Sequence, residues 1–204
     1  MKYHKTWDEI LGQGSKVKIL RVLASEPVEL TGMEIARLAK QSQRNIHASL
    51  YSLFKAGIVL MRRSGKSKLY QLNSDSVLVK QALLPLFRLE KNLLGEIADK
   101  IGKRVKNILS IILFGSVAEG KEKGDSDLDI LIVMSLRASL PESEKVLDQL
   151  NFEISKGFGN GLSPVLLKVN DFKRRYKAKD ELIRKIADHG RLLYGKTPLE
   201  LIYD

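Results

Sequence analysis

Apolar residues recur at two different periods along the chain, and the change of period predicts two kinds of structure. Over the first 57 residues they recur every three or four positions, as on the buried face of an amphipathic helix. Four helices are predicted there, with apolar faces within residues 3–11, 19–23, 35–39 and 46–54. From residue 58, the β-prone runs IVLM and KLYQL flank RRSGKS, so a β-hairpin is predicted to follow the helices.

Polar residues mark the ends of the predicted helices. Ser15, Thr31 and Ser42 precede three of them, where a hydroxyl can accept a hydrogen bond from a free N–H of the first turn. Glu34 follows Thr31 by three residues and completes a capping box, and Gly57 suits the end of the last helix. The first third of the chain is therefore predicted as a small helical unit with a hairpin.

A long helix is predicted over residues 76–105, interrupted only by Pro85. Its apolar stripe consists of Leu86, Leu89, Leu93, Leu94, Ile97, Ile101 and Val105. The stripe must be buried, either on the C-terminal part of the chain or on the same helix of a second copy in a homodimer. Beyond it, buried strands are predicted at residues 111–114, 127–133 and 163–169, and helices at 141–158 and 180–193. These elements predict a small mixed sheet with helices on one side.

Composition excludes several classes of protein. The 204 residues include no cysteine, which excludes disulfides, Cys-ligated zinc and thiol nucleophiles. No apolar run reaches about 18 residues, and the first 16 residues lack the apolar core of a signal peptide, so no membrane span and a cytoplasmic location are expected. The net charge is +11, of which residues 1–75 carry +7. Such a basic excess is typical of nucleic-acid binding, and equally of a solvated surface.

The predicted fourth helix and the hairpin carry side chains suited to duplex DNA. Gln43, Arg44, Asn45, His47 and Ser49 avoid the apolar stripe of that helix. In a major groove, Arg can pair with guanine, and Asn or Gln with adenine. At the hairpin tip, the basic side chains Arg62, Arg63, Lys66 and Lys68 suit phosphate contacts. The alternative is that this unit packs on protein and its charges are only solvated.

Residues 15–73 resemble a winged helix-turn-helix domain of the prokaryotic regulator type. The resemblance is carried by TGMEIARLAK, by SQRNIHASLYSLFKAGIV and by the basic hairpin. It implies that the first domain binds double-stranded DNA. Because helix-turn-helix proteins usually bind as dimers, a homodimer is expected.

A second motif lies in IILFGSVAEGKEKGDSDLDILIV, residues 111–133, with the spacing G-S-x3-G-x5-S-D-L-D. Asp127 and Asp129 are two apart on a predicted strand, so they point to one face and repel each other unless a cation lies between them. Carboxylates at this spacing suit Mg²⁺ that is also held by substrate phosphates. Gly115 allows a close backbone approach, and Ser116 can donate to a phosphate oxygen near a helix start. The set indicates phosphoryl or nucleotidyl transfer.

This motif and its flanking strands resemble the nucleotidyltransferase superfamily of the DNA polymerase β type, in particular its minimal members. The resemblance implies that Gly115 and Ser116, with Gly120 and Ser126, bind a nucleoside triphosphate (NTP). Asp127 and Asp129 would be catalytic carboxylates that ligate Mg²⁺ or Mn²⁺. An acceptor hydroxyl would attack the α-phosphate and release pyrophosphate.

The sequence departs from the family pattern in two places. Glu119 stands where many members carry Arg, which puts an acid near the phosphates. The family's third carboxylate is on a later strand, but SPVLLKV at residues 163–169 holds no acid. Asp171 lies just past that strand and Glu153 lies well before it. Turnover is therefore expected to be slow or absent even where nucleotide binding is intact.

Together these inferences predict an α+β protein: a winged helix-turn-helix domain (1–75), a helical linker (76–105) and a polymerase β-type nucleotidyltransferase domain (106–204). One hypothesis is a DNA-binding transcriptional regulator whose second domain binds Mg-NTP. A second is an active nucleotidyltransferase that modifies a small molecule, RNA or protein. A third is an antitoxin-like member that nucleotidylates a partner protein. The missing carboxylate favours the first, and the intact Gly-Ser and Asp-x-Asp set favours the others.

Overall fold

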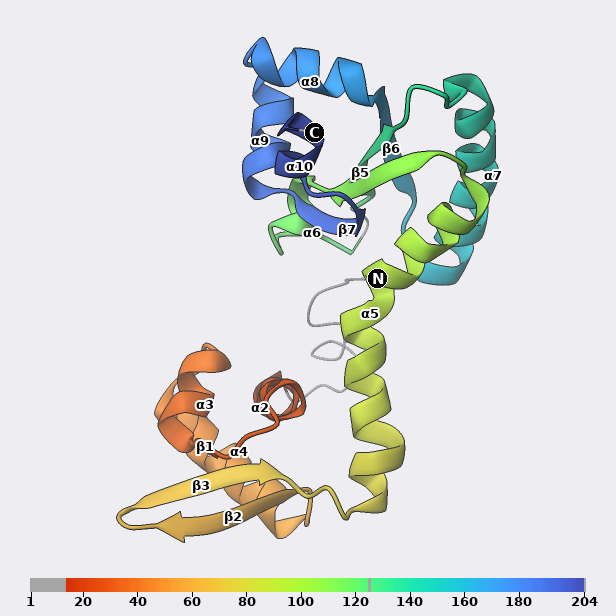
Figure 1. The fold of residues 1–204 in the computed structure, drawn as a ribbon. Helices are drawn as coiled ribbons and strands as arrows, with labels where there is room; N and C mark the ends of the chain where they lie inside the picture. Colours follow the sequence, from red (N-terminus) through yellow and green to blue (C-terminus); the bar gives the residue numbers. More distant parts are fainter. Residues whose placement is uncertain (1–13, 125, 204) are drawn as a thin grey trace. The chain divides into compact units, whose positions relative to one another are not determined.

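Helices and a small antiparallel sheet build the part of the chain that precedes residue 92. The computed structural model describes residues 14–124 and 126–203, so the helix predicted over residues 3–11 lies outside the described residues. The helices are α2 (Gly14–Ser25), α3 (Gly32–Leu38) and α4 (Gln43–Lys55). The strands β1 (Leu30–Thr31), β2 (Val59–Ser64) and β3 (Ser67–Leu72) pair in the order β1-β3-β2 (Figure 1). The chain divides into two compact units, within residues 5–91 and 92–204.

Two of the three predicted N-caps form, at Thr31 and Ser42. The prediction for Ser15 is wrong, because α2 begins one residue earlier and the Ser15 hydroxyl lies 2.9 Å from the Ser49 hydroxyl. The Thr31 hydroxyl accepts from the Glu34 N–H, and the Glu34 carboxylate accepts from the Thr31 N–H at 2.8 Å. The Ser42 hydroxyl caps α4 in the same way through the Asn45 N–H. With both helix starts fixed, apolar side chains such as Ile35, Ile46 and Leu50 are fully buried in a shared core.

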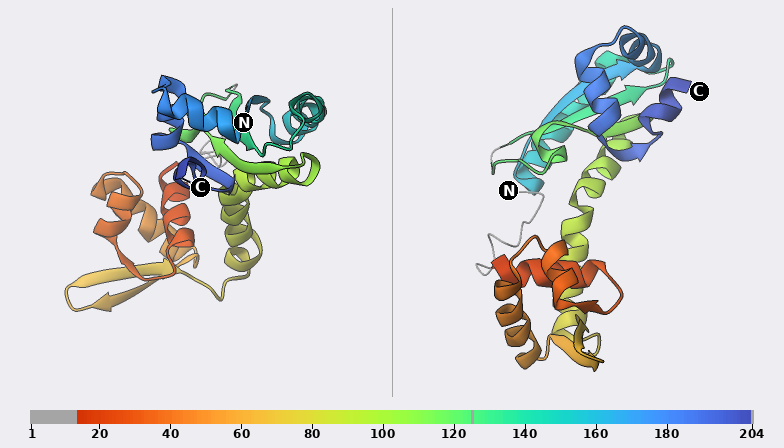
Figure 2. Two further views of the ribbon diagram at one scale, coloured as in Figure 1. Left: turned by 45° about the horizontal axis from the view of Figure 1, so that its top comes forward. Right: turned by 90° about the vertical axis from the view of Figure 1, so that its left-hand side faces the viewer.

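The hairpin is longer than predicted. Ser64 pairs with Ser67, which leaves a two-residue turn at Gly65 and Lys66, and Gly65 has the positive φ of 57° that such turns require. Arg62, Arg63 and Lys68 therefore belong to the strands, and of the four basic residues only Lys66 lies at the tip. The prediction that all four lie at the tip is wrong, because backbone pairing continues to the turn even where both strand faces are solvated. The hairpin projects beyond the helices of its unit (Figures 1 and 2).

The predicted long helix consists of a π-helical turn, η1 (Val79–Leu83), followed by α5 (Leu84–Arg104). Pro85 is the second residue of α5, directly after this π-helical turn. The predicted stripe divides between the two units. Leu86 packs against the core of the first unit, Leu89 is exposed, and the residues from Leu93 to Val105 pack in the core of the second. Most of the stripe is thus covered within the chain. None of the described helices is long and apolar enough to cross a membrane.

The second unit contains a four-stranded sheet in the order β6-β5-β4-β7. Its elements after α5 are β4 (Ile108–Leu113), α6 (Gly115–Ala118), β5 (Leu128–Met134), α7 (Leu140–Phe158), β6 (Leu162–Lys168), α8 (Val169–Lys177), α9 (Glu181–His189), β7 (Arg191–Gly195) and α10 (Pro198–Tyr203). Strands β5 and β6 are parallel, whereas β4 is antiparallel to both β5 and β7. The sheet is therefore mixed, as predicted.

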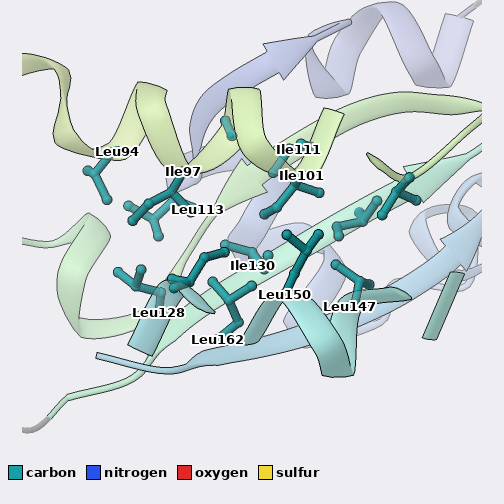
Figure 3. Close-up of a cluster of buried hydrophobic side chains, with 14 of the residues drawn as sticks. Leu94, Ile97, Ile101, Ile111, Leu113, Leu128, Ile130, Leu147, Leu150 and Leu162 are labelled. Carbon is teal, nitrogen blue, oxygen red and sulfur yellow. The ribbon is translucent and has the colours of Figure 1, made fainter. Parts of the chain in front are cut away.

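Helices cover both faces of this sheet, and the prediction of helices on one side is wrong (Figures 1 and 2). On one face, Ile130 and Ile132 of β5 pack with residues of α5 and α7, and Figure 3 shows part of this cluster. On the other face, Leu131 and Val133 pack with Phe172 of α8 and with residues of α9 and α10. The continuous apolar run of β5 reflects this burial on both faces, which is typical of strands in α/β units.

Strand β7 replaces the end of the helix predicted over residues 180–193. Helix α9 ends at His189 because Gly190 adopts an extended conformation, and RLLYG then pairs with β4. A Cβ on Gly190 would lie 2.4 Å from the Ile186 carbonyl oxygen and 2.6 Å from Ile112 Cγ2. This close packing of the helix end on β4 permits glycine alone.

Gly190→Ala is expected to destabilise the protein by about 1–3 kcal/mol, because the new methyl group overpacks a site bounded by backbone. The matched control is Gly157→Ala in α7, where a Cβ meets nothing within 4 Å. That substitution is expected to stabilise the protein by about 0.5–1 kcal/mol, since alanine is the better helix former. Thermal and urea unfolding of both variants measures the difference, and a neutral Gly190→Ala would contradict the close packing.

Candidate functional site

The two predicted carboxylates lie at the start of β5, next to the end of β4. The Phe114 N–H donates to the Asp129 carbonyl oxygen at 2.9 Å, which joins the two strand ends. Leu128 and Ile130 point into the core shared with α5 and α7. Because side chains alternate along a strand, Asp129 lies on the other face with Leu131 and Val133, and Asp127 precedes it on the same side.

Gly115 brings the backbone at the start of α6 against the Asp129 carboxylate. Its φ is +70°, and a Cβ there would lie 2.1 Å from Asp129 Oδ2, so glycine is required on both grounds. Helix α6 has only four residues, and its first N–H groups have no partner within the helix. Those N–H groups and the half-buried Ser116 are therefore available as donors beside the carboxylate.

Asp127 lies close to Gly161, the residue that precedes β6. A Cβ on Gly161 would lie 3.1 Å from Asp127 Oδ1 and 3.3 Å from Asn151 Oδ1, a tight fit in which both side chains would have to shift by a few tenths of an ångström. The Leu128 N–H donates to the Gly161 carbonyl at 2.8 Å, and the Leu162 N–H donates to Asn151 Oδ1 at 2.7 Å. The start of β6 is thus fixed beside the start of β5.

The loop between α6 and β5 is shaped by its own side chains and by Asn160. Gly120 ends α6 with a φ of +67°, and the Ser126 hydroxyl accepts from the Lys123 N–H at 2.9 Å. The buried Asn160 amide donates to the carbonyl oxygens of Gly124 and Ser126, at 3.2 and 2.7 Å. Gly120 and Ser126 therefore shape the loop that precedes the carboxylates. Sequence reasoning missed Asn160, for which the Gly-Asn-Gly run before a strand was the available signal.

The environment of Asp129 disfavours its negative charge. Burial raises the pKa of the Asp129 carboxyl, the neighbouring charge of Asp127 raises it further, and a hydrogen bond from the Ser163 hydroxyl acts in the opposite direction. Ser163 lies beside Asp129 in the parallel register of β5 and β6. Two adjacent carboxylates that repel each other form a site that a cation would stabilise.

The donor set fits Mg²⁺ that brings further ligands with it. Within residues 14–124 and 126–203, no three His, Asp or Glu side chains cluster as metal ligands. Two carboxylates are nevertheless the usual protein share of a magnesium site whose remaining positions are filled by water and substrate phosphates. Asp127 and Asp129 therefore fit a divalent ion that binds together with a phosphate-bearing substrate.

Neither candidate for a third carboxylate lies at this site. Asp171 is on α8, past the far end of β6, and forms an ion pair with Arg174 at 2.7 Å. The strand from Ser163 to Lys168 alone separates it from the carboxylates by about 16 Å. Glu153 is on α7 and forms a bidentate pair with Arg104. Neither residue therefore completes the site, and the β6 position beside Asp129 is Ser163.

The negative charge of Glu119 is compensated by two lysines. Its carboxylate pairs with Lys121 at 2.9 Å and with Lys185 of α9 at 3.1 Å, and both lysines lower its pKa. Sequence reasoning missed Lys185, because only the packing of α9 beside α6 brings it there. The chain thus places two cations near the start of the loop that leads to the carboxylates.

In the first unit, the predicted DNA-contacting residues are exposed, with the exception of Ser49. A groove of about 630 Å³ is lined by Gln43 and His47 of α4 and by Lys66 and Lys68 of the hairpin, together with residues of α3. Arg62 lies outside this lining and forms an ion pair with Glu29. Arg44, Asn45 and Arg63 are also not among the lining residues.

Ser49 is not a surface residue. It is buried in α4, and its hydroxyl is 2.9 Å from the Ser15 hydroxyl of α2. The prediction that it faces away from the core is wrong, because a small polar side chain can be buried where a second hydroxyl satisfies it.

A comparison with protein-family models finds a match within the second unit. Residues 96–198 match the family model described as "Polymerase beta, Nucleotidyltransferase". A Methanocaldococcus jannaschii protein named "Putative protein adenylyltransferase MJ1305" is 28% identical over 114 residues, which are 53% of this chain and 76% of that protein.

Two solved structures are similar at a lower level. One is the homodimeric winged helix-turn-helix DNA-binding domain of Mb0332 from Mycobacterium bovis, with 24% identity, 45% of this chain and 78% of that chain covered, and a TM-score of 0.33. The other is a toxin–antitoxin structure with AMP-PNP, with 16% identity, 53% and 80% covered, and a TM-score of 0.38. Both TM-scores are too low for a conclusion about this chain.

Asp129→Asn is expected to stabilise the metal-free protein at pH 7 and to have little effect at pH 3. A raised carboxyl pKa means that the folded state holds its proton longer than the unfolded state. The destabilisation caused by the Asp129 charge is therefore absent below the unfolded-state pKa and grows as the pH rises toward and through the folded-state pKa. Thermal unfolding at both pH values in a chelating buffer measures this, and an equal effect of the substitution at both would refute the assignment.

Proposed function

The chain belongs to the polymerase beta nucleotidyltransferase family, and from this membership we propose that its second unit binds Mg-NTP and transfers the nucleotidyl group to a hydroxyl of a partner protein. The observation that carries the proposal is the contact of the Asp129 carboxylate with the backbone at Gly115. Through this contact, two carboxylates that suit a cation lie next to backbone N–H groups that suit phosphate oxygens. A protein acceptor is supported by the name of the Methanocaldococcus jannaschii relative.

Each residue of the site has a role that follows from its position. Asp127 and Asp129 hold the Mg²⁺ or Mn²⁺ ion, which when bound neutralises phosphate charge. Ser116 and the free N–H groups of α6 donate to phosphate oxygens, and Gly115 keeps the backbone close enough for them to do so. Gly120, Ser126 and Asn160 hold the loop that positions the carboxylates.

The reaction joins the oxygen of the acceptor hydroxyl to the α-phosphorus and breaks the bond to pyrophosphate. The hydroxyl proton must leave as this bond forms, and no third carboxylate of the described residues lies at the site to take it. We therefore expect slow turnover, with the proton passing to solvent or to a group of the acceptor. Without turnover, the same site would make the chain a regulator that has Mg-NTP as its ligand.

A second function, binding of duplex DNA by the first unit, is favoured by the groove between α4 and the hairpin. Gln43 and His47 can face base edges while Lys66 and Lys68 contact phosphates. In winged helix-turn-helix domains the recognition helix likewise contacts the bases and other residues contact the backbone. This proposal includes a DNA-binding domain that ends at residue 75, a helical linker that ends at residue 105, and assembly of the chain as a homodimer. Two copies would place their α4 helices about 34 Å apart on DNA. Since most of the α5 stripe is covered within the chain, the dimer would use another surface.

The paired substitution Asp127→Asn and Asp129→Asn is expected to abolish Mg²⁺-dependent NTP binding, because it preserves shape and removes both charges. Calorimetry with each NTP, with and without Mg²⁺, measures this. Asp148→Asn on the exposed side of α7 is the matched control and should bind as the wild type does. Equal binding by the paired variant and the control would remove the two aspartates from the site.

Lys66→Ala with Lys68→Ala is expected to weaken the binding of the full chain to all duplex sequences. The slope of log K against log salt should fall in magnitude by about 2, or about 0.9 per lost phosphate contact. Arg44→Ala or Asn45→Ala should instead relax sequence preference, at about 1–3 kcal/mol per lost base contact. Lys55→Ala, at the far end of α4, is the control. An unchanged slope in the paired variant would count against the groove as a DNA site.

A further inference from the structure

A cavity of about 240 Å³ lies between α6 and α9 in the second unit. Its walls are mostly apolar and come from Phe114, Ala118, Leu182 and Ile186. Three polar side chains also line it: Glu119, Lys185 and His189. Such a combination of apolar walls with a few polar groups is typical of small-molecule sites.

The cavity adjoins the carboxylate site through Gly115. The backbone of Gly115 contacts the Asp129 carboxylate, and the same residue lines the cavity. A ligand whose phosphates bind at the start of α6 could therefore extend a second group directly into the cavity. No residue of α9 takes part in the site as the family motif defines it.

We propose that this cavity is the subsite for the nucleobase of the bound nucleoside triphosphate, an assignment that depends on the proposed function above. Sites for whole drug-sized ligands usually measure about 300–1,000 Å³, so the cavity suits one ring system rather than a complete nucleotide. Flat ring faces fit between Leu182 and Ile186 of α9 and Ala118 of α6. A phosphate does not fit, because the walls are mostly apolar.

Lys185 is the residue that selects among bases in this arrangement. Glu119 Oε1 lies 3.1 Å from Lys185 Nζ and so holds the ammonium group at the cavity. An ammonium group donates hydrogen bonds and accepts none, so it favours a base edge that presents acceptors. The geometry thus makes Lys185 a specificity-determining residue and Glu119 the residue that positions it.

Leu182→Trp tests the subsite, because an indole at the exposed cavity wall would occupy the space of the base. Calorimetry would compare Mg-NTP with Mg-tripolyphosphate, which has the phosphates and no base. Binding of the NTP is expected to weaken at least tenfold while binding of tripolyphosphate stays within twofold of wild type. Leu199→Trp, on the exposed side of α10, is the matched control and should change neither.

A second variant, Lys185→Met, tests selection. It should bring the dissociation constants of the four NTPs to within about twofold of one another, whereas the wild type should separate them. Equal losses for NTP and tripolyphosphate in Leu182→Trp, or no loss for either, would overturn the subsite while leaving the phosphate site intact. A wild-type chain that binds neither ligand in the presence of Mg²⁺ would refute the proposed function itself, and the subsite with it.

Discussion

The contact between the Asp129 carboxylate and the backbone at Gly115 is the constraint on which the candidate site depends. It requires the end of β4 and the start of β5 to lie side by side, which the Phe114–Asp129 backbone hydrogen bond and the antiparallel register provide. It also requires that β5 stay in place under the repulsion between its two acidic side chains. Burial of β5 on both faces, against α5 and α7 on one side and α8 to α10 on the other, supplies that rigidity.

Several acidic side chains of the second unit form ion pairs with basic ones, whereas Asp129 lies in surroundings that disfavour its charge. Glu119 is compensated by two lysines, Glu153 by Arg104 and Asp171 by Arg174. Asp129 differs, because its burial and its acidic neighbour both act against its charge. A carboxylate held in an unfavourable environment by a rigid scaffold is a common property of functional sites, where stability is given up for binding.

Local signals in the sequence were sufficient to predict most of the helices and strands and the positions of the two aspartates, but not what surrounds them. The capping residues Thr31 and Ser42 and the Gly-Ser and Asp-x-Asp motifs act over a few residues, so their consequences could be predicted. Strand β7 was missed because the apolar residues after Gly190 fit a helix as well as a strand until β4 is present to pair with them. Lys185 and Ser163 reach the site only through the packing of α9 and the register of β6, which no local pattern encodes. For Asn160 the Gly-Asn-Gly run was the one local signal.

The hydrogen bonds of Asn160 and Asn151 have a consequence for how the second unit opens. Asn160 joins the loop before β5 to the segment between α7 and β6, Asn151 joins α7 to the start of β6, and the Leu128–Gly161 bond closes the same network. Local unfolding of the loop would therefore have to break the α7–β6 junction as well, so the two segments form one cooperative unit. Hydrogen exchange at Leu128 and at Leu162 would then share a single opening free energy, although 34 residues separate them in the chain. A bound ligand would slow the exchange of both together.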